Sequence, residues 1–218
     1  MSSDSVPLVP PLASPFEAIA AALLDRGWGV FTGLLPVPLT DALCQRARAL
    51  STYRAAAIGR QTDTQLNPFV RRDRIAWIEP ATPEEQGWLE WAESLRTHLN
   101  HTLMLGLASF ESHFALYGPG DFYRRHLDAF QGGRSRMVSV VLYLNPAWLP
   151  SDGGELVLYG PNDNEIGRFP PVLGTLVVYL SERFPHEVLP TRTHRYSIAG
   201  WFRQRPEPVL AHALDLSD

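Results

Sequence analysis

The chain has 218 residues, 45% of them hydrophobic, so it can bury a full core and fits one domain better than two. Its formal net charge of −4 gives no basic footprint for a nucleic-acid backbone, which disfavours generic nucleic-acid binding. All 19 basic residues are arginine, which excludes a lysine Schiff base, a pyridoxal phosphate anchor and a P-loop lysine.

The start of the chain and its cysteine content bear on location. Residues 1–14 are rich in Ser and Pro and carry no basic residue, so we expect a disordered lead-in and no secretory signal. The single Cys44 cannot form an internal disulfide and is expected to be a reduced, buried thiol. No apolar run reaches the roughly 18 to 20 residues of a membrane span. We therefore expect a soluble, cytoplasmic protein with no membrane partner.

Two helices are predicted before residue 55. Ser14-Pro15-Phe16-Glu17 is typical of a capped helix start and predicts a helix over 15–26. Its apolar stripe is expected to consist of Ile19, Leu23 and Leu24. A short strand over 28–31 follows, and a second helix is expected over 40–51.

A lid and a long helix are predicted next. The segment 55–72 contains Gly59 and Asn67-Pro68, which favour a loop of the kind that closes over a substrate. Thr82-Pro83-Glu84-Glu85 is a capping box that opens the longest helix, about 83–106. An apolar stripe at helical spacing is a packing surface more often than a cofactor box. The stripe consists of Trp88, Trp91, Leu95, Leu99 and Leu103.

From residue 109 onward, short apolar segments alternate with Gly, Pro and Asn-Asp turns. The pattern predicts strands over 109–117, 121–128, 136–145, 154–159, 164–169, 173–180, 186–190 and 195–203. Eight strands punctuated in this way indicate two facing sheets, and a jelly roll is one standard way to close them. The expected fold class is therefore mainly β with supporting helices (α+β).

Two histidines and one carboxylate stand at a spacing that can bind a metal ion. His126 and Asp128 would project together from an extended segment, because alternate residues of a strand point to the same face. His186 lies far downstream, but a barrel or sandwich brings distant strands together. Such a triad can occupy one face of Fe(II) and leave the other open for a co-substrate and O2. A surface histidine hydrogen-bonded to a nearby aspartate is the alternative for His126 and Asp128 alone.

Further motifs accompany the triad in a fixed order. They are Tyr117-Gly118-Pro119-Gly120, Tyr123, Tyr143-Leu144-Asn145, Gly153-Gly154-Glu155-Leu156, His186-Glu187-Val188 and Arg195-Tyr196-Ser197-Ile198-Ala199-Gly200-Trp201-Phe202. In this order the chain resembles the Fe(II)/2-oxoglutarate-dependent prolyl 4-hydroxylases, particularly bacterial relatives of the hypoxia-inducible-factor prolyl hydroxylases. The separate segment 71–79 resembles the stretch that ends a mobile loop closing over the substrate proline in that family.

The resemblance implies a double-stranded β-helix (jelly roll) flanked by N-terminal helices, within one domain over 15–205 and before a tail over 206–218. It implies that His126, Asp128 and His186 hold Fe(II), that 2-oxoglutarate and O2 are co-substrates, and that succinate and CO2 are released, with ascorbate as an optional reductant. The resemblance also implies three contacts with 2-oxoglutarate. They are a paired, charge-assisted interaction of Arg195 with the far carboxylate, a hydroxyl donated by Tyr143, and Tyr117 beside them.

The substrate expected from the resemblance is a prolyl residue in a protein or peptide, with a translation factor such as elongation factor Tu as a hypothesis by analogy. The residues that would contact it are Arg71, Asp73, Arg136 and Trp201. Arg136 can equally be a solvated residue beside a turn, and Arg203 is expected at the surface.

Two alternative functions are compatible with part of this motif pattern. A related oxygenase acting on a small metabolite or free amino acid would retain the triad and Arg195 behind a different entrance. A non-catalytic ligand-binding β-sandwich would bind no Fe(II). Alkylation repair is disfavoured, because residues 195–199 lack the expected Arg-x-Asn-x-Thr-x-Arg pattern. The sequence leaves the oligomeric state open.

Overall fold

A computed structural model describes residues 14–56, 67–128 and 136–205 of the chain. Almost all of the predicted lead-in, the tail over 206–218 and residues 57–66 of the predicted lid lie outside the described residues. Within the described ranges, no helix is both long enough and apolar enough to cross a membrane.

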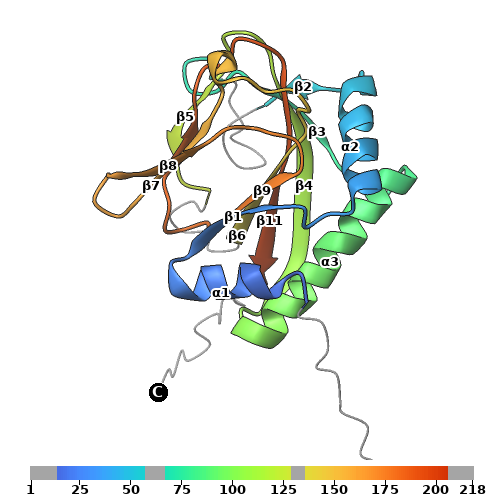
Figure 1. The fold of residues 1–218 in the computed structure, drawn as a ribbon, viewed down its shortest axis with the longest axis vertical. Helices are drawn as coiled ribbons and strands as arrows, with labels where there is room; N and C mark the ends of the chain where they lie inside the picture. Colours follow the sequence, from blue (N-terminus) through green and yellow to red (C-terminus); the bar gives the residue numbers. More distant parts are fainter. Residues whose placement is uncertain (1–13, 57–66, 129–135, 206–218) are drawn as a thin grey trace, which may run out of the picture.

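Two antiparallel sheets face each other, and helices cover the outer side of the larger one (Figure 1). The larger sheet has the order β1 (Trp28–Thr32), β9 (Thr175–Leu180), β6 (Arg136–Tyr143), β11 (Arg195–Gln204), β4 (Leu107–Tyr117), β3 (Arg74–Trp77) and β2 (Arg54–Ala55). The smaller sheet has the order β5 (Tyr123–His126), β10 (His186–Val188), β7 (Leu156–Tyr159) and β8 (Glu165–Phe169). A short 3-10 helix spans Pro150–Asp152. This mainly β architecture confirms the predicted jelly roll with supporting helices.

The three helices are α1 (Glu17–Asp25), α2 (Val37–Ala49) and α3 (Pro83–Leu103). The start predicted for α1 is two residues too early, because Ser14 Oγ accepts a hydrogen bond from the backbone N–H of Phe16 ahead of the helix. Leu24 is also wrong as a stripe residue: α1 buries only a narrow face, and Leu24 projects past it into solvent. Helix α2 begins three residues earlier than predicted, since a proline fits its first turn.

The long helix α3 follows the prediction closely. Thr82 Oγ1 accepts a hydrogen bond from the backbone N–H of Glu85 at 3.4 Å, so Thr82 is the N-cap. Glu85 does not complete a capping box, because its carboxylate pairs with Arg46 of α2 at 3.0 Å. The predicted stripe is packing surface: Trp88, Leu95 and Leu99 are fully buried.

Strand alternation separates two hydrophobic cores. One set of alternate residues of the large sheet, such as Phe114, Ile198 and Phe202, packs against the helices. The opposite set, such as Ala115, Val141 and Tyr179, faces the smaller sheet. All eight predicted strands are present, with no bound shifted by more than two residues, whereas β2 and β3 were not predicted as strands. The inner face of the large sheet therefore forms one wall of the space between the sheets.

We predict that Thr82→Ala lowers the free energy of unfolding by about 1 kcal/mol, because the first turn of α3 loses its cap. Ser94→Ala is the matched control on the same helix, since the Ser94 hydroxyl is exposed and only bonds back to the carbonyl of Glu90. Urea titrations followed by circular dichroism measure both variants. Equal midpoints for Thr82→Ala and the wild-type protein would contradict the capping role.

Candidate functional site

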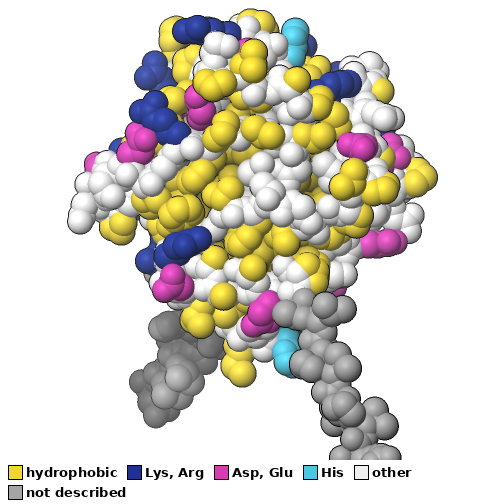
Figure 2. Space-filling model, viewed as in Figure 1, with side chains coloured by type: hydrophobic (Ala, Val, Ile, Leu, Met, Phe, Trp, Pro, Cys, Tyr) yellow, Lys and Arg dark blue, Asp and Glu magenta, His cyan; other side chains and the backbone are white. Residues whose placement is uncertain are grey.

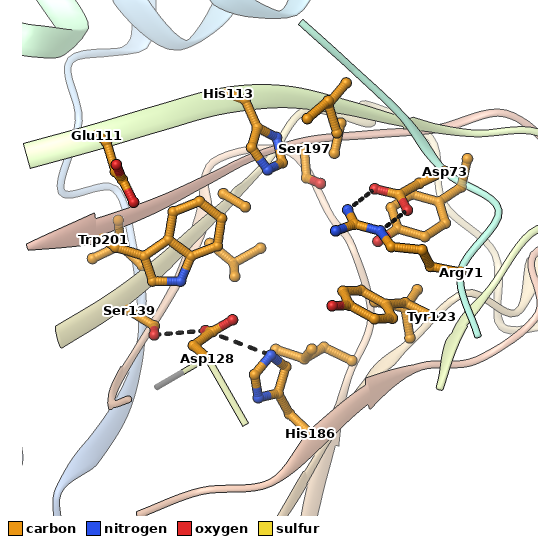
Figure 3. Close-up of a pocket in the computed structure, with 18 of the residues that line it drawn as sticks. Arg71, Asp73, Glu111, His113, Tyr123, Asp128, Ser139, His186, Ser197 and Trp201 are labelled. Carbon is orange, nitrogen blue, oxygen red and sulfur yellow. Dashed lines mark hydrogen bonds and ion pairs between the residues drawn. The ribbon is translucent and has the colours of Figure 1, made fainter. Parts of the chain in front are cut away.

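A cavity of about 970 Å³ lies between the two sheets. Strands β3, β4, β6 and β11 supply its wall on the large sheet, and β5 and β10 supply residues from the small sheet. Figure 3 shows His113, Ser197 and Trp201 on one side of the open centre, with Asp128, His186 and Tyr123 across it. The cavity therefore collects side chains from segments far apart in the sequence.

The structure brings His126, Asp128 and His186 together at this cavity. His126 ends β5 and lies directly opposite His186, which begins β10. One ligand atom from each residue lies within 4.8 Å of the others, and the Asp128 oxygens are 3.7 Å from His126 Nε2 and 3.6 Å from His186 Nε2. Ligands that are each about 2.1 Å from one ion lie about 3 to 4 Å apart. The three side chains thus form a candidate metal centre.

Hydrogen bonds to the backbone orient both imidazoles. His126 Nδ1 lies 2.8 Å from the carbonyl oxygen of Arg124, and His186 Nδ1 lies 3.2 Å from that of Phe184. A carbonyl oxygen only accepts, so each Nδ1 carries the proton and each Nε2 presents a lone pair toward Asp128. Burial lowers the pKa of His186 to about 4, which keeps that ring neutral at pH 7. This is the tautomer that a metal ligand requires.

Two hydroxyl-bearing residues of the large sheet contact Asp128, and a third hydroxyl supports one of them. Its Oδ2 accepts hydrogen bonds from Ser139 Oγ at 2.7 Å and from Tyr179 Oη at 3.1 Å, and Ser181 Oγ lies 2.8 Å from Ser139 Oγ. Burial alone would raise the pKa of Asp128, but positive charge on the His186 or His126 imidazole lowers it, and so does the hydrogen bond from the Ser139 hydroxyl. Asp128 is therefore an ionised, oriented carboxylate.

A stack of side chains supports His126 from the other side. The Tyr123 ring lies 3.6 Å from the His126 ring at an interplanar angle of 16°, and the Arg71 guanidinium lies over Tyr123 at 4.3 Å. Arg71 is itself fixed by Asp73, to which Nε and Nη2 donate hydrogen bonds of 2.8 and 2.6 Å. The predicted substrate residues Arg71 and Asp73 therefore form a buried ion pair in the cavity wall that also positions a candidate metal ligand.

Arg195 is a buried cation without a buried anion. Its side chain is 1% exposed, Nε donates to the carbonyl of Gly154 at 2.8 Å, and Nη1 donates to Ser197 Oγ at 3.2 Å. Among the described residues, no carboxylate forms an ion pair with it. A guanidinium stays protonated in such surroundings, so no described residue neutralises the positive charge of Arg195. An anionic ligand in the cavity would neutralise it.

Two tyrosines flank Arg195. Its guanidinium lies 4.9 Å from the Tyr117 ring and 5.2 Å from the Tyr143 ring. The Tyr143 hydroxyl is buried and has no hydrogen-bond partner in the part of the chain that the structure describes. Burial raises the pKa of Tyr143 to about 12 against the opposing charge of Arg195, so its O–H remains a donor. Such an orphaned donor beside an unpaired cation fits an anionic ligand.

Arg136 and Trp201 lie together on the cavity wall. The Arg136 guanidinium is 3.8 Å from the Trp201 ring centroid, and Nη2 donates to Glu111 at 2.8 Å. Arg203 also donates to Glu111, at 2.8 Å, and lines the same cavity, while its side chain is 37% exposed, as expected for a surface arginine. Arg136 is part of this ion-paired group and is not the isolated solvated residue of the alternative reading.

Sequence reasoning missed Ser139, Tyr179 and His113, which face the cavity from three strands of the large sheet. Ser139 and Tyr179 touch Asp128, whereas His113 lies farther along the wall. Their inward direction follows from strand alternation. Their neighbours follow from cross-strand register, for which the sequence carried no signal.

Comparisons with known proteins agree with this geometry. The pattern of the 2OG-Fe(II) oxygenase superfamily matches residues 112–203. Human Egl nine homolog 1 is 31% identical over 222 residues, which cover 93% of this chain and 50% of that protein. The hypoxia-inducible factor prolyl hydroxylase of Caenorhabditis elegans is 34% identical over 97 residues, or 43% of this chain and 13% of that protein. The chain thus spans at most half the length of these two curated relatives.

A solved structure matches over nearly its whole length. A prolyl-4-hydroxylase of Pseudomonas putida is 42% identical and superimposes with a TM-score of 0.79. The match covers 87% of this chain and 99% of that one.

We predict that His126→Ala abolishes tight binding of Mn(II), because the ion loses one of its three protein ligands. Leu127→Ala is the control, since Leu127 lies between His126 and Asp128 and is partly exposed to solvent. Isothermal titration calorimetry with Mn(II) measures both. Wild-type affinity in His126→Ala would remove that residue from the metal centre.

We predict that Tyr179→Phe weakens Mn(II) binding about tenfold, because residues that orient metal ligands affect affinity by about 10- to 100-fold. The Tyr179 hydroxyl touches both Asp128 and His186. Tyr159→Phe is the control, since the Tyr159 hydroxyl bonds Glu187 instead. If the two variants bind Mn(II) equally well, Tyr179 does not orient the site.

Proposed function

Because the chain belongs to the prolyl hydroxylases of the 2OG-Fe(II) oxygenase superfamily, we propose that it is a 2-oxoglutarate-dependent dioxygenase that hydroxylates a prolyl residue in a protein or peptide. One observation supports the co-substrate above all others. Arg195 is fully buried without an ion-pair partner among the described residues, and it lines the same cavity as the triad.

The triad fits the metal that the superfamily uses. His126, Asp128 and His186 would hold Fe(II), since two imidazoles and a carboxylate form the facial donor set of such sites. Bound Fe(II), with O2 and 2-oxoglutarate, supplies the oxidising power for C–H hydroxylation. Ser139 and Tyr179 keep Asp128 ionised and oriented, and the backbone carbonyls of Arg124 and Phe184 keep the imidazoles in the ligand tautomer.

The far end of the cavity suits the other carboxylate of a short diacid. Arg195 lines the cavity there with a planar guanidinium, and the Tyr143 hydroxyl, which has no described hydrogen-bond partner, belongs to a ring beside that guanidinium that does not itself line the cavity. Charge-assisted hydrogen bonds of this kind are about twice as strong as neutral ones, so this pair can both orient 2-oxoglutarate and select against monoacids. Tyr117 closes one side of the pocket with its ring.

The walls toward the opening suit a prolyl side chain. Ile75, Trp77, Tyr123 and Trp201 present apolar or aromatic surface there, and proline is a compact apolar ring. These walls also displace water from the space beside the triad, which strengthens every polar interaction within it. We further propose a translation factor as the target class, by analogy with bacterial relatives.

We predict that the wild-type protein with Fe(II) and 2-oxoglutarate forms succinate faster when a proline-containing protein extract is added. Mass spectrometry of the extract should then show a shift of about +16 Da on prolyl residues. Stimulation by free amino acids and not by protein would favour the small-metabolite alternative. No 2-oxoglutarate consumption under any of these conditions would favour the non-catalytic sandwich.

We predict that Arg195→Ala weakens 2-oxoglutarate binding about 10- to 100-fold, the effect expected for a lost hydrogen bond to a charged group. Arg195→Lys should recover only part of the loss, because an ammonium lacks the planar fork. Arg168→Ala is the control, since Arg168 is exposed and pairs with Glu165 on β8. Calorimetry on the Mn(II)-loaded protein reads binding without turnover, and equal affinities would refute the acid pocket.

A further inference from the structure

One row of side chains across the inner face of the large sheet contains a single polar member. Cross-strand register places Trp77 opposite His113, His113 opposite Ala199, Ala199 opposite Val141, and Val141 opposite Val177. Residues directly opposite each other in a sheet project to the same face. His113 is therefore an imidazole in a row that is otherwise aromatic or aliphatic.

The His113 ring offers the cavity an unused hydrogen-bond acceptor. The side chain is 4% exposed, and Nδ1 lies 3.2 Å from the carbonyl oxygen of Phe114, so Nδ1 carries the proton. The Nε2 atom forms no hydrogen bond with the described residues. Burial lowers the pKa of His113 to about 4, and the charge of Arg71 acts in the same direction, against that of Asp73. The ring is thus neutral at pH 7, with a lone pair on Nε2.

The fold itself does not explain a histidine at this position. Nε2 is open to the cavity, so water can reach it in the free protein. A ligand that displaces this water without donating a hydrogen bond would leave the acceptor unpaired, which is unfavourable. The aromatic contacts of His113, 5.2 Å from the Trp77 ring and 5.4 Å from the Trp201 ring, would be open to an apolar residue as well. A ligand that fills this part of the cavity must therefore donate a hydrogen bond to Nε2 in place of water.

His113 faces the cavity from β4. It extends from β4 toward the open centre, with the triad residues Asp128 and His186 on the far side (Figure 3). Trp77, its neighbour in the row, is 55% exposed and marks the outer side of the wall. The small side chain of Ala199 leaves room beside the imidazole. His113 is therefore set between the opening and the candidate metal centre.

The charged residues around His113 indicate which kind of hydrogen-bond donor a ligand would present to Nε2. Burial beside the ring opposes any cationic group, and so do the positive charges of Arg71 and Arg136, whereas the negative charge of Asp73, already paired with Arg71, acts in the opposite direction. This disfavours an ammonium, whether from a lysine or from the free amino group of an amino acid. A neutral N–H fits better. Proline has no backbone N–H, so in a prolyl substrate the donor must belong to a neighbouring residue.

The geometry points to His113 as a substrate-binding residue whose Nε2 accepts a hydrogen bond from the backbone N–H of a residue adjacent to the hydroxylated proline. The inference rests on the proposed function and narrows it: the ligand class is an extended peptide segment and not a free amino acid. Because the contact lies away from Arg195 and the triad, it acts on peptide affinity and leaves the binding of 2-oxoglutarate and metal unchanged.

The first experiment compares His113→Leu with His113→Gln. A tryptic digest of a bacterial proteome is incubated with the wild-type protein, Fe(II) and 2-oxoglutarate, and a peptide that gains about 16 Da on proline is synthesised as the probe. We expect His113→Leu to raise KM for this peptide about tenfold with kcat within about twofold. His113→Gln should restore most of the affinity, because its amide oxygen is an acceptor.

A second measurement identifies the donor. Each backbone N–H near the proline of the probe is replaced in turn by N–CH3. In the wild-type protein, one such replacement should raise KM about tenfold, and in His113→Leu the same replacement should add nothing. Thermal unfolding provides the structural control, since His113→Leu should melt at or above the wild-type temperature.

The outcomes separate the two proposals. If the wild-type protein modifies no peptide, the proposed function fails, and the inference fails with it. If peptides are modified but KM is the same in all His113 variants, or if N-methylation and His113→Leu have additive effects, only the role of His113 is overturned. Should His113→Leu unfold at a lower temperature, His113→Gln and the N-methyl series in the wild-type protein decide.

Discussion

The pairing of β5 with β10 is the constraint on which the whole site depends. It sets His126 directly opposite His186, and the two residues that follow β5 return Asp128 toward the large sheet. There Ser139 and Tyr179 hold the carboxylate. The donor set is thus attached to both sheets at once. Packing the two sheets against each other therefore also assembles the metal centre. An ion that binds the folded state thus stabilises the fold.

Strand β11 distributes the chemistry along the cavity. Its inward residues are Arg195, Ser197, Ala199 and Trp201, while Ile198 and Phe202 pack against the helices. One strand therefore supplies the buried cation at one end, a small residue in the middle and an aromatic wall toward the opening. The helices matter to function indirectly, because their packing on the outer face supports the strand whose inner residues line the cavity.

Two local sequence patterns explain how much of the fold could be predicted: the alternation of apolar residues along strands, and the Gly, Pro and capping residues that mark the ends of elements. The eight strands after residue 107 and the long helix α3 follow from local patterns, since Gly, Pro and a Thr82 cap act within a few residues. The short strands β2 and β3 escaped prediction because Arg54 and Arg74 give them no apolar alternation, and the pairing of β2 with β3 and of β3 with β4 is a tertiary effect. Leu24 was wrongly assigned to the packing stripe of α1. Helical periodicity identifies the apolar face of a helix, but it does not show how much of that face a neighbouring element covers.

The sequence by itself determined the chemical inventory: two histidines, one aspartate and a late arginine in a family-like order, and no lysine. Motif spacing could group these residues because His126, His186 and Arg195 stand at strand ends and Asp128 follows two residues after His126. Only the tertiary structure decided their partners. Tyr179 touches Asp128, Arg71 stacks behind His126 through Tyr123, and His113 joins an apolar row, because register between strands distant in sequence is set by packing of the two sheets.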